Sequence, residues 1–182
     1  MTSKSTDERR TPRWFFEACD RLWGPFDLDA WAAKWNRQVE RYCSVERSVY
    51  ELRPRARRTW GQPPYSRGQL DKALGFGREM VLKRRWGSAT FLIPIDPSTD
   101  WWKRHIARPE GAKRRVDWLT GELPAPFNHE AYRLVSERLA VTVAPPNQRL
   151  AFDPPPWLPP RELEKFRGAK QPSVVVVFER NK

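Results

Sequence analysis

Residues 59–68, TWGQPPYSRG, are poorly suited to the interior of a helix or a strand. Each proline fixes its own backbone angle, donates no backbone hydrogen bond and pushes the preceding residue into an extended conformation. The sequence therefore predicts a stiff, extended loop at Gln62, Pro63, Pro64 and Tyr65. Such a loop presents a side-chain amide, at least one free backbone carbonyl and an aromatic ring.

These groups suit chemistry on the exocyclic amino group of a nucleic-acid base. The amino nitrogen of adenine or cytosine shares its lone pair with the ring and is a weak nucleophile. One side-chain acceptor and one backbone acceptor favour the tetrahedral nitrogen that develops as it attacks a methyl donor. Tyr65 can stack on a base that has been rotated out of the duplex. The same loop also fits a polyproline ligand or a plain surface loop.

Two further groups with possible chemistry precede the loop. Asp27 and Asp29 stand in FDLDA, which alternates apolar and acidic residues as a short strand does. We expect both carboxylates at the end of that strand, where aspartates are also common turn formers. Thr11 and Pro12 open the segment TPRWFFEACDRLWG and predict a helix with a threonine N-cap and a proline in its first turn.

Helices and strands alternate through the first two thirds of the chain. A short strand is expected before Trp60, an amphipathic helix over residues 68–85, and a helix from residue 98 or 99. SATFLIPI is an apolar run typical of a strand buried on both faces. KRRVDWLTGEL indicates a strand and a turn, and AAKWNRQVERYCS is predicted to be partly helical. This order predicts an α/β fold with a mainly parallel sheet and flanking helices.

In a parallel sheet, ligands bind at the carboxyl ends of the strands. FDLDA, the proline loop and IDPSTD each lie where a predicted strand ends. We therefore expect three polar clusters to face one crevice.

Residues 11–182 are predicted to form a single domain after a disordered tail over residues 1–10. A proline-rich insert at about residues 121–172 is predicted to be loops, with one short helix near NHEAYRLVSERLA and a strand near QRLAF. SVVVVFERN then closes the chain as a buried strand.

The charge balance favours a polyanionic partner. The 182 residues include 34 Lys and Arg against 22 Asp and Glu, a formal charge of +12, and nucleic acid is the commonest partner for such an excess. A basic but otherwise ordinary protein is the alternative. Ten tryptophans are also many, and some can serve as stacking surfaces for bases.

Basic stretches would hold DNA phosphates, or else form a solvated surface. The residues are Arg53, Arg55, Arg57, Arg58, Lys83, Arg84, Arg85, Lys113, Arg114 and Arg115. The chain has little room for a separate recognition domain, so the proline-rich insert, with Trp157, is the expected reader of DNA sequence.

The two cysteines, Cys19 and Cys43, have neither CxxC spacing nor a ligand-rich neighbourhood. This pattern argues against a structural zinc and against a disulfide framework, and predicts a reduced, cytoplasmic protein without a metal. The longest apolar runs are strand-sized, far below the ~20 residues that span a bilayer. His105 and His129 are interpreted as ordinary structural or surface histidines.

The order of these motifs resembles the small phage DNA N-6-adenine methyltransferases. TPRWFFEAC resembles their opening Thr-Pro helix, FDLDAWAAKWN their Phe-Asp-Leu-Asp segment with its following asparagine (here Asn36), and PPYS their catalytic loop. RYCSVE, FLIPIDPSTDWW, QRLAF and PSVVVVF resemble later family motifs. The likeness runs from Thr11 to the final strand, and implies a Rossmann-like fold that depends on S-adenosylmethionine.

The resemblance also implies roles for individual residues. Thr11 and Pro12 would lie beside the methionine end of the cofactor, and Asp27 and Asp29 would hold its amino group or ribose hydroxyls. In the loop, the Gln62 side chain, Pro63 and Pro64 would present acceptors to the adenine amino group of double-stranded DNA, and Tyr65 would stack on the flipped base.

The chain departs from the family pattern at Gln62, where the family has asparagine or aspartate. Glutamine carries the same amide on a side chain one methylene longer, and a displacement of about 1 Å can lower a rate on the order of 10²-fold. IDPSTD also lacks the family's arginine, and the segment between Gly121 and Arg149 is longer than expected. The leading hypothesis is adenine methylation in DNA. The alternatives are another amino group (cytosine, an RNA base or a protein amide) or a catalytically decayed nucleic-acid-binding protein.

Overall fold

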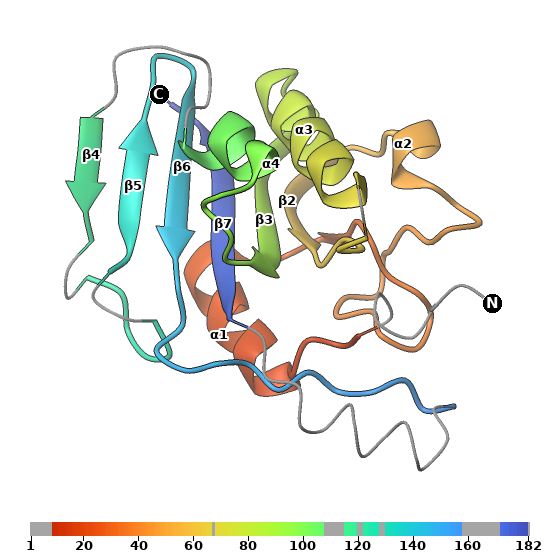
Figure 1. Cartoon of the computed structure of the whole chain (residues 1–182). Coiled ribbons are helices and arrows are strands. Elements are labelled where there is room, and N and C mark those ends of the chain that lie inside the picture. The colour runs from red at the N-terminus through yellow and green to blue at the C-terminus, as the bar shows by residue number, and fades with distance from the viewer. Residues whose placement is uncertain are drawn as a thin grey trace.

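A computed structural model describes residues 9–66, 68–107, 115–119, 122–127, 130–157 and 172–181. Its centre is a seven-stranded sheet in the order β1-β2-β3-β7-β6-β5-β4 (Figure 1). The strands are β1 (Leu28–Asp29), β2 (Ala56–Gly61), β3 (Trp86–Pro94), β4 (Arg115–Trp118), β5 (Tyr132–Val135), β6 (Leu139–Ala144) and β7 (Ser173–Arg180).

The expectation of a mainly parallel sheet is wrong. Only the pairs β1–β2 and β2–β3 are parallel, and the other four pairs are antiparallel. Two of the four involve β7, the last strand of the chain, which inserts between β3 and β6 and runs against both, and the other two are β4–β5 and β5–β6. The parallel part nevertheless includes β1, which ends at Asp29, and β2, which the proline loop follows. The carboxyl ends of these two strands therefore lie at one edge of the sheet.

Helices cover both faces of this sheet (Figure 1). They are α1 (Arg13–Trp23), α2 (Val49–Leu52), α3 (Gln69–Leu82), α4 (Asp100–Trp102) and the π-helical turn η1 (Lys103–Ala107). The α1 helix buries Phe15, Phe16 and Cys19 against one face, and the α3 helix buries Leu74 and Met80 against the other. The expected helices at the Thr-Pro segment, at residues 68–85 and after residue 98 are confirmed.

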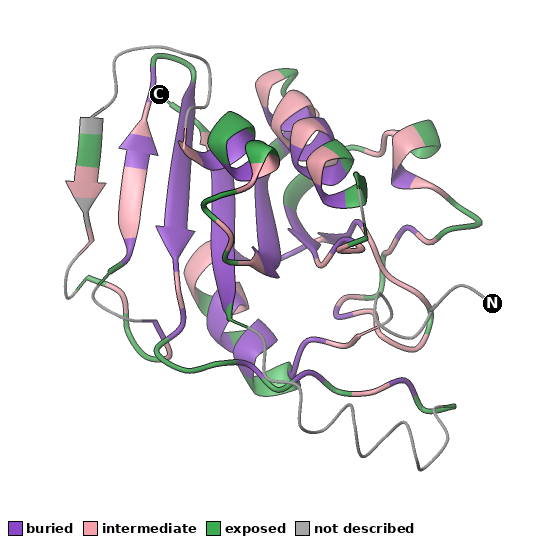
Figure 2. Ribbon diagram, viewed as in Figure 1, coloured by how far each residue is buried: buried purple, intermediate pink, exposed green. Residues whose placement is uncertain are grey.

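Strand β7 joins the two cores because its side chains alternate between them. Val174 and Val176 belong to the cluster that includes α3, while Val175 and Val177 belong to the cluster that includes α1. Figure 2 shows β7 and β6 buried along most of their lengths. An uninterrupted apolar run is what a strand covered on both faces requires, so SVVVVFERN is confirmed as a buried strand.

The segment from residue 30 to 48 is irregular, with a turn at residues 34–36 and no helix. The expectation of partial helix there is wrong. The short helix that does occur, α2, begins after Ser48, whose hydroxyl caps the N–H of Tyr50 at 3.2 Å.

The helix expected near NHEAYRLVSERLA is also wrong, because this region forms the β5–β6 hairpin. Ser136 Oγ at the turn donates to the Leu139 carbonyl at 2.9 Å and accepts from the Leu139 N–H at 3.2 Å. QRLAF is not a strand. Of its residues, Leu150 alone forms an isolated β-bridge, and its side chain belongs to the hydrophobic cluster that includes α1. No helix in the described ranges combines the length and apolarity needed to cross a bilayer.

Candidate active site

The proline loop continues directly from the carboxyl end of β2. Gln62, Pro63, Pro64 and Tyr65 have no regular secondary structure, as predicted, and Pro63 is buried while the other three are half-buried. Within the described residues, the Pro63 carbonyl has no hydrogen-bond partner. The loop therefore presents the free backbone acceptor that the diproline pattern predicts.

Gly61 sets where the loop leaves the sheet. A Cβ atom at this position would lie 2.6 Å from Cε3 of Trp31 and 3.7 Å from Cδ1 of Phe91. Only a residue without a side chain allows the Trp31 ring to cover the end of β2. The Trp31 indole N–H in turn donates to the Tyr50 hydroxyl at 3.1 Å, which fixes the ring over the strand.

Tyr65 closes the loop onto the sheet. Its hydroxyl donates to the carbonyl of Leu92, on β3, at 3.0 Å. The carbonyl belongs to a central strand, so the tyrosine is anchored at its far end while its ring remains half-buried. A stacking ring requires a fixed position, which this hydrogen bond supplies.

Thr11 reaches the loop from the segment before α1. Its Oγ1 lies 2.6 Å from Gln62 Oε1, and the hydroxyl donates because the amide oxygen accepts. Thr11 is 1% exposed, so the bond is shielded from water. The expected N-cap role is wrong: Pro12 occupies the N-cap position, and no side chain caps the helix.

Asp29 lies at the carboxyl end of β1, as expected, and is 2% exposed. Gln38 connects it to Thr11: the Gln38 backbone N–H donates to Asp29 Oδ2 at 3.0 Å, and its Nε2 donates to the Thr11 carbonyl at 2.7 Å. Burial raises the pKa of Asp29 to about 7, although backbone hydrogen bonds from Gln38 and Trp31 lower it in part. The carboxyl group thus titrates near neutrality.

Gln38 itself has an unsatisfied acceptor. Its side chain is 6% exposed, and no donor among the described residues reaches its Oε1. The amide orientation is fixed because the nitrogen is needed at the Thr11 carbonyl. Sequence reasoning missed this residue, since a glutamine in the polar stretch NRQVE carries no signal of burial.

Asp27 is not brought to this site. It precedes β1, and its carboxylate accepts hydrogen bonds from the backbone N–H groups of Arg57 and Arg58 at 2.9–3.0 Å. The carboxylate therefore aligns the amino half of β2 with β1. Of the two aspartates expected at the strand's end, only Asp29 lies there.

The predicted phosphate-binding residues also lie away from the loop. Arg53, Arg55, Arg57 and Arg58 precede or begin β2, and Lys83, Arg84 and Arg85 precede β3. Both groups are therefore at the amino ends of the strands, opposite Gln62. Lys113 and Arg114 lie outside the described residues, as does the side chain of Arg115.

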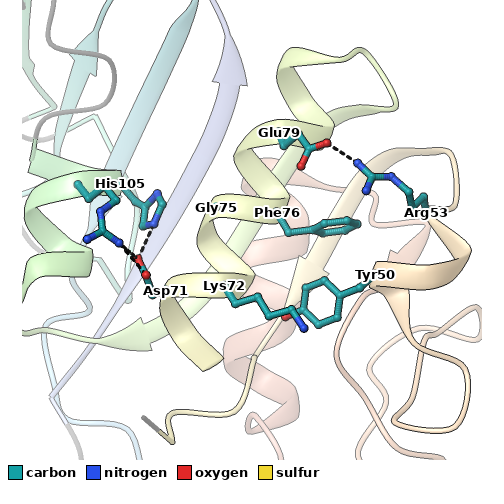
Figure 3. Close-up of a pocket in the computed structure, with 9 residues that line it drawn as sticks. Tyr50, Arg53, Asp71, Lys72, Gly75, Phe76, Glu79 and His105 are labelled. Carbon is teal, nitrogen blue, oxygen red and sulfur yellow. Dashed lines mark hydrogen bonds and ion pairs between the residues drawn. The ribbon is translucent and has the colours of Figure 1, made fainter. Parts of the chain in front are cut away.

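A surface hollow of about 370 Å³ lies between α2, α3 and η1 rather than at the loop. Figure 3 shows its charged residues in pairs: Glu79 contacts Arg53, and Asp71 accepts from Arg104 at 2.7 Å and contacts His105 Nε2 at 2.8 Å. Burial lowers the pKa of His105, although the contact with Asp71 raises it in part. Lys72 is the exception to this pairing, because its Nζ lies 4.1 Å from the centroid of the Tyr50 ring and not beside a carboxylate.

A loop with two carbonyl acceptors and a fixed tyrosine thus adjoins a buried carboxylate at one edge of the sheet. The family model for DNA N-6-adenine-methyltransferase (Dam) matches residues 1–182. The chain belongs to the Dam family. Neither the curated proteins nor the solved structures include a match to it. The mixed α/β fold with its mostly antiparallel sheet is consistent with a methyltransferase-like fold, and membership of the Dam family implies a DNA substrate.

Dam-family enzymes use S-adenosylmethionine, and the groups around Asp29 fit such a molecule. The carboxyl group of Asp29 and the Oε1 of Gln38, which has no donor among the described residues, are acceptors, and Gln38 joins Asp29 to the Thr11 carbonyl. An amino acid ammonium and ribose hydroxyls are donors, so the two sets are complementary. A buried acceptor without a donor is unfavourable by about 1–3 kcal/mol, which a bound donor would remove.

Proposed function

We propose that this protein transfers a methyl group from S-adenosylmethionine to the exocyclic amino group of adenine in double-stranded DNA. The observation that carries the proposal is the Thr11–Gln62 hydrogen bond, which joins the proline loop to the Thr11–Gln38–Asp29 group. Strands β1, β2 and β3 are adjacent and parallel, and the proline loop and the Thr11–Gln38–Asp29 group lie at their carboxyl ends. This order supports a Rossmann-like arrangement of this part of the sheet.

Asp29, Gln38 and Thr11 would hold the cofactor. S-adenosylmethionine, when bound, supplies a methyl group on a positively charged sulfur. Asp29 would hold a donor of the cofactor best when ionised, and its raised pKa makes this state dependent on pH near 7. Pro12, at the start of α1, keeps Thr11 beside the loop because its carbonyl accepts from Phe15 and Phe16.

The loop would hold the target amino group through two acceptors. Gln62 Oε1 uses one lone pair for Thr11 and retains the other, and the Pro63 carbonyl has no partner in the described residues. Together they would accept both N–H groups of adenine and direct the nitrogen lone pair away from the ring. Tyr65 would stack on the flipped base, and Pro64 would keep the loop extended.

The longer side chain of Gln62 has a physical explanation in this arrangement. Glutamine can place its oxygen within reach of a hydroxyl on a neighbouring segment, and Thr11 provides that hydroxyl at 2.6 Å. The bond removes the rotational freedom that an extra methylene adds. We therefore interpret Gln62 as a substitute for the shorter residue of the family. The position of the Gln62 side chain depends on Thr11.

Part of the proline-rich insert lies on the same side and would contact the DNA. Asp153 pairs with Arg10 through two backbone hydrogen bonds of 2.9 and 3.1 Å, next to Thr11. Trp157 is 57% exposed and packs edge-on against Trp35, with ring centroids 5.1 Å apart. An exposed indole supported by Trp35 suits the role of DNA reader proposed for this insert.

Mass spectrometry of nucleosides tests the proposal. DNA from cells that produce the protein is digested, and N6-methyladenine and methylcytosines are quantified. We expect N6-methyladenine with the wild type, less with Tyr65→Phe, which keeps the stacking ring but loses the hydrogen bond to Leu92, and least with Tyr65→Ala. Methylcytosine instead would assign the loop to another amino group.

Calorimetry with S-adenosylmethionine then separates the remaining alternative. A decayed nucleic-acid-binding protein would give neither methylated DNA nor heat of cofactor binding. Cofactor binding without methylated DNA would instead point to an RNA base or a protein amide as the acceptor.

A further inference from the structure

The basic residues at the amino ends of β2 and β3 fall into two groups. Arg53 and Lys83 both contact Glu79, the latter at 2.7 Å, and these contacts lower the pKa of Glu79. Arg85 donates from Nε and Nη2 to the Arg53 carbonyl at 3.1 and 2.6 Å. These three cations hold the junction between α2, α3 and β3 together.

The second group has no such partners. The side chains of Arg55, Arg57, Arg58 and Arg84 make no hydrogen bond or ion pair with any described residue, and all four residues are exposed. Asp27 fixes the backbone N–H groups of Arg57 and Arg58, which as consecutive residues of β2 lie on opposite faces of the sheet, and Arg84 adopts a left-handed φ of 58° after α3. We name these four residues the amino-end arginines.

The amino-end arginines are separated from the catalytic loop by the length of a strand. Arg57 and Gln62 lie on the same strand and its immediate extension, five residues apart, which corresponds to about 17 Å of β structure. A duplex whose base enters the loop lies against the carboxyl edge of the sheet. The protein itself stands between that duplex and the amino-end arginines.

Four guanidinium groups without acidic partners favour a phosphate backbone. Arginine binds phosphate through paired hydrogen bonds, and the chain's formal charge of +12 attracts polyanions at long range. We propose that the amino-end arginines bind a second DNA segment, so that the protein bridges two duplexes. This inference rests on the proposed function, because it takes the carboxyl edge as the position of the target duplex.

A capture assay tests whether the protein bridges two duplexes and does not depend on methyl transfer. A duplex fixed to a bead is incubated with the protein and a dye-labelled second duplex, and the retained dye is measured. The variant with Arg55, Arg57, Arg58 and Arg84 all replaced by Gln is expected to retain about tenfold less dye. Capture should weaken as the salt concentration rises. Each lost phosphate contact should reduce the slope of the logarithm of the binding constant against the logarithm of the salt concentration by about 0.9.

Methylation of a short duplex provides the second readout. On a duplex of about 12 base pairs with a central target, roughly 40 Å long, the fourfold variant should keep the wild-type rate. Equal loss of capture and of short-duplex methylation would overturn the proposal, since the arginines would then touch the target duplex itself. Unchanged capture would overturn it as well.

A pair of adjacent residues gives the matched control. Lys83→Gln and Arg84→Gln remove the same charge, but Lys83 is paired with Glu79 and Arg84 is not. Only Arg84→Gln should weaken capture. If no methylation is found with any duplex while the capture results hold, the proposed activity fails and bridging stands.

Discussion

The hydroxyl of Thr11 determines where the carbonyl oxygen of Gln62 points, because the two groups are joined by a buried hydrogen bond of 2.6 Å. Thr11→Val keeps the shape of the residue and removes the donor. We expect the rate of methyl transfer to fall about 5- to 10-fold, which corresponds to the roughly 1–1.4 kcal/mol of one hydrogen bond. Single-turnover kinetics on a DNA duplex would measure the change.

Thr11→Ser is the matched control, since it retains the hydroxyl and should retain most of the activity. Gln62→Asn supplies the second test because the shorter side chain no longer reaches Thr11. In the Gln62→Asn background, Thr11→Val should have little further effect. Equal effects of Thr11→Val in both backgrounds would show that Thr11 acts independently of Gln62.

Asp29 makes the stability of the protein depend on pH. Its pKa rises from the ordinary 3.8 to about 7 on folding, because the carboxyl group is buried. Between these values the unfolded chain has lost the proton and the folded chain retains it. The free energy of unfolding should therefore fall as pH rises through this window, by up to about 1.4 kcal/mol per pH unit, and level off above pH 7.

Asp29→Asn removes this titration and should flatten the dependence. Urea unfolding at several pH values from 4 to 8 would compare the two proteins. A wild-type curve that rises with pH over the same range, or an Asn variant that keeps the same fall, would contradict the assignment of a raised pKa to this carboxyl group.

At the scale of single elements, the end of β2 depends on the contact between Gly61 and Trp31. Gly61→Ala places a Cβ 2.6 Å from the Trp31 ring, so the ring or the strand must move. We expect a loss of about 1–3 kcal/mol in the free energy of unfolding. Because the proline loop begins at the next residue, activity should fall further than stability alone explains. Thermal unfolding and initial rates would measure the two effects.

Trp31→Leu provides the control for this contact. The smaller side chain leaves room for the added methyl group, so Gly61→Ala should be less destabilising in the Trp31→Leu background than in the wild type. Additive effects of the two changes would mean that the alanine clashes elsewhere.

Elements with strong local signals are the ones that the sequence predicts correctly. The Thr-Pro segment, the helix after the proline loop and the apolar strands SATFLIPI and SVVVVFERN each contain a continuous period or a long apolar run. The β5–β6 hairpin was missed because Tyr132, Val135 and Leu139, at i, i+3 and i+7, also fit a helical face. The β-branched residues of LAVTVA, buried at every position, were the contrary signal.

Strand direction and long-range side-chain partners could not be predicted in the same way. Nothing local in SVVVVFERN indicates that it inserts antiparallel between β3 and β6. The chemistry proposed for Gln62, Pro63 and Tyr65 follows from residue types, but the Thr11–Gln62 bond spans 51 residues. The role of Gln38 depends on burial that only the folded chain reveals.

On the scale of the whole molecule, the sheet separates two regions of different character. Its carboxyl edge gathers the proline loop and the Thr11–Gln38–Asp29 group, whereas its amino edge carries arginines without partners among the described residues. The two cores on either face join through β7, so the edges belong to one packed unit. A ligand bound at the carboxyl edge therefore stabilises the entire fold.

S-adenosylmethionine should accordingly raise the melting temperature of the protein. A ligand that binds only the folded state stabilises it by about 2.7 kcal/mol at 100 times its dissociation constant, or roughly 5–10 °C for a chain of this length. Differential scanning calorimetry at pH 8, where Asp29 is ionised, would measure the shift. Tyr65→Ala should keep the shift because the proposal assigns Tyr65 to the base and not to the cofactor, and Asp29→Asn should reduce it. No shift with the wild type would mean that the carboxyl edge does not hold the cofactor.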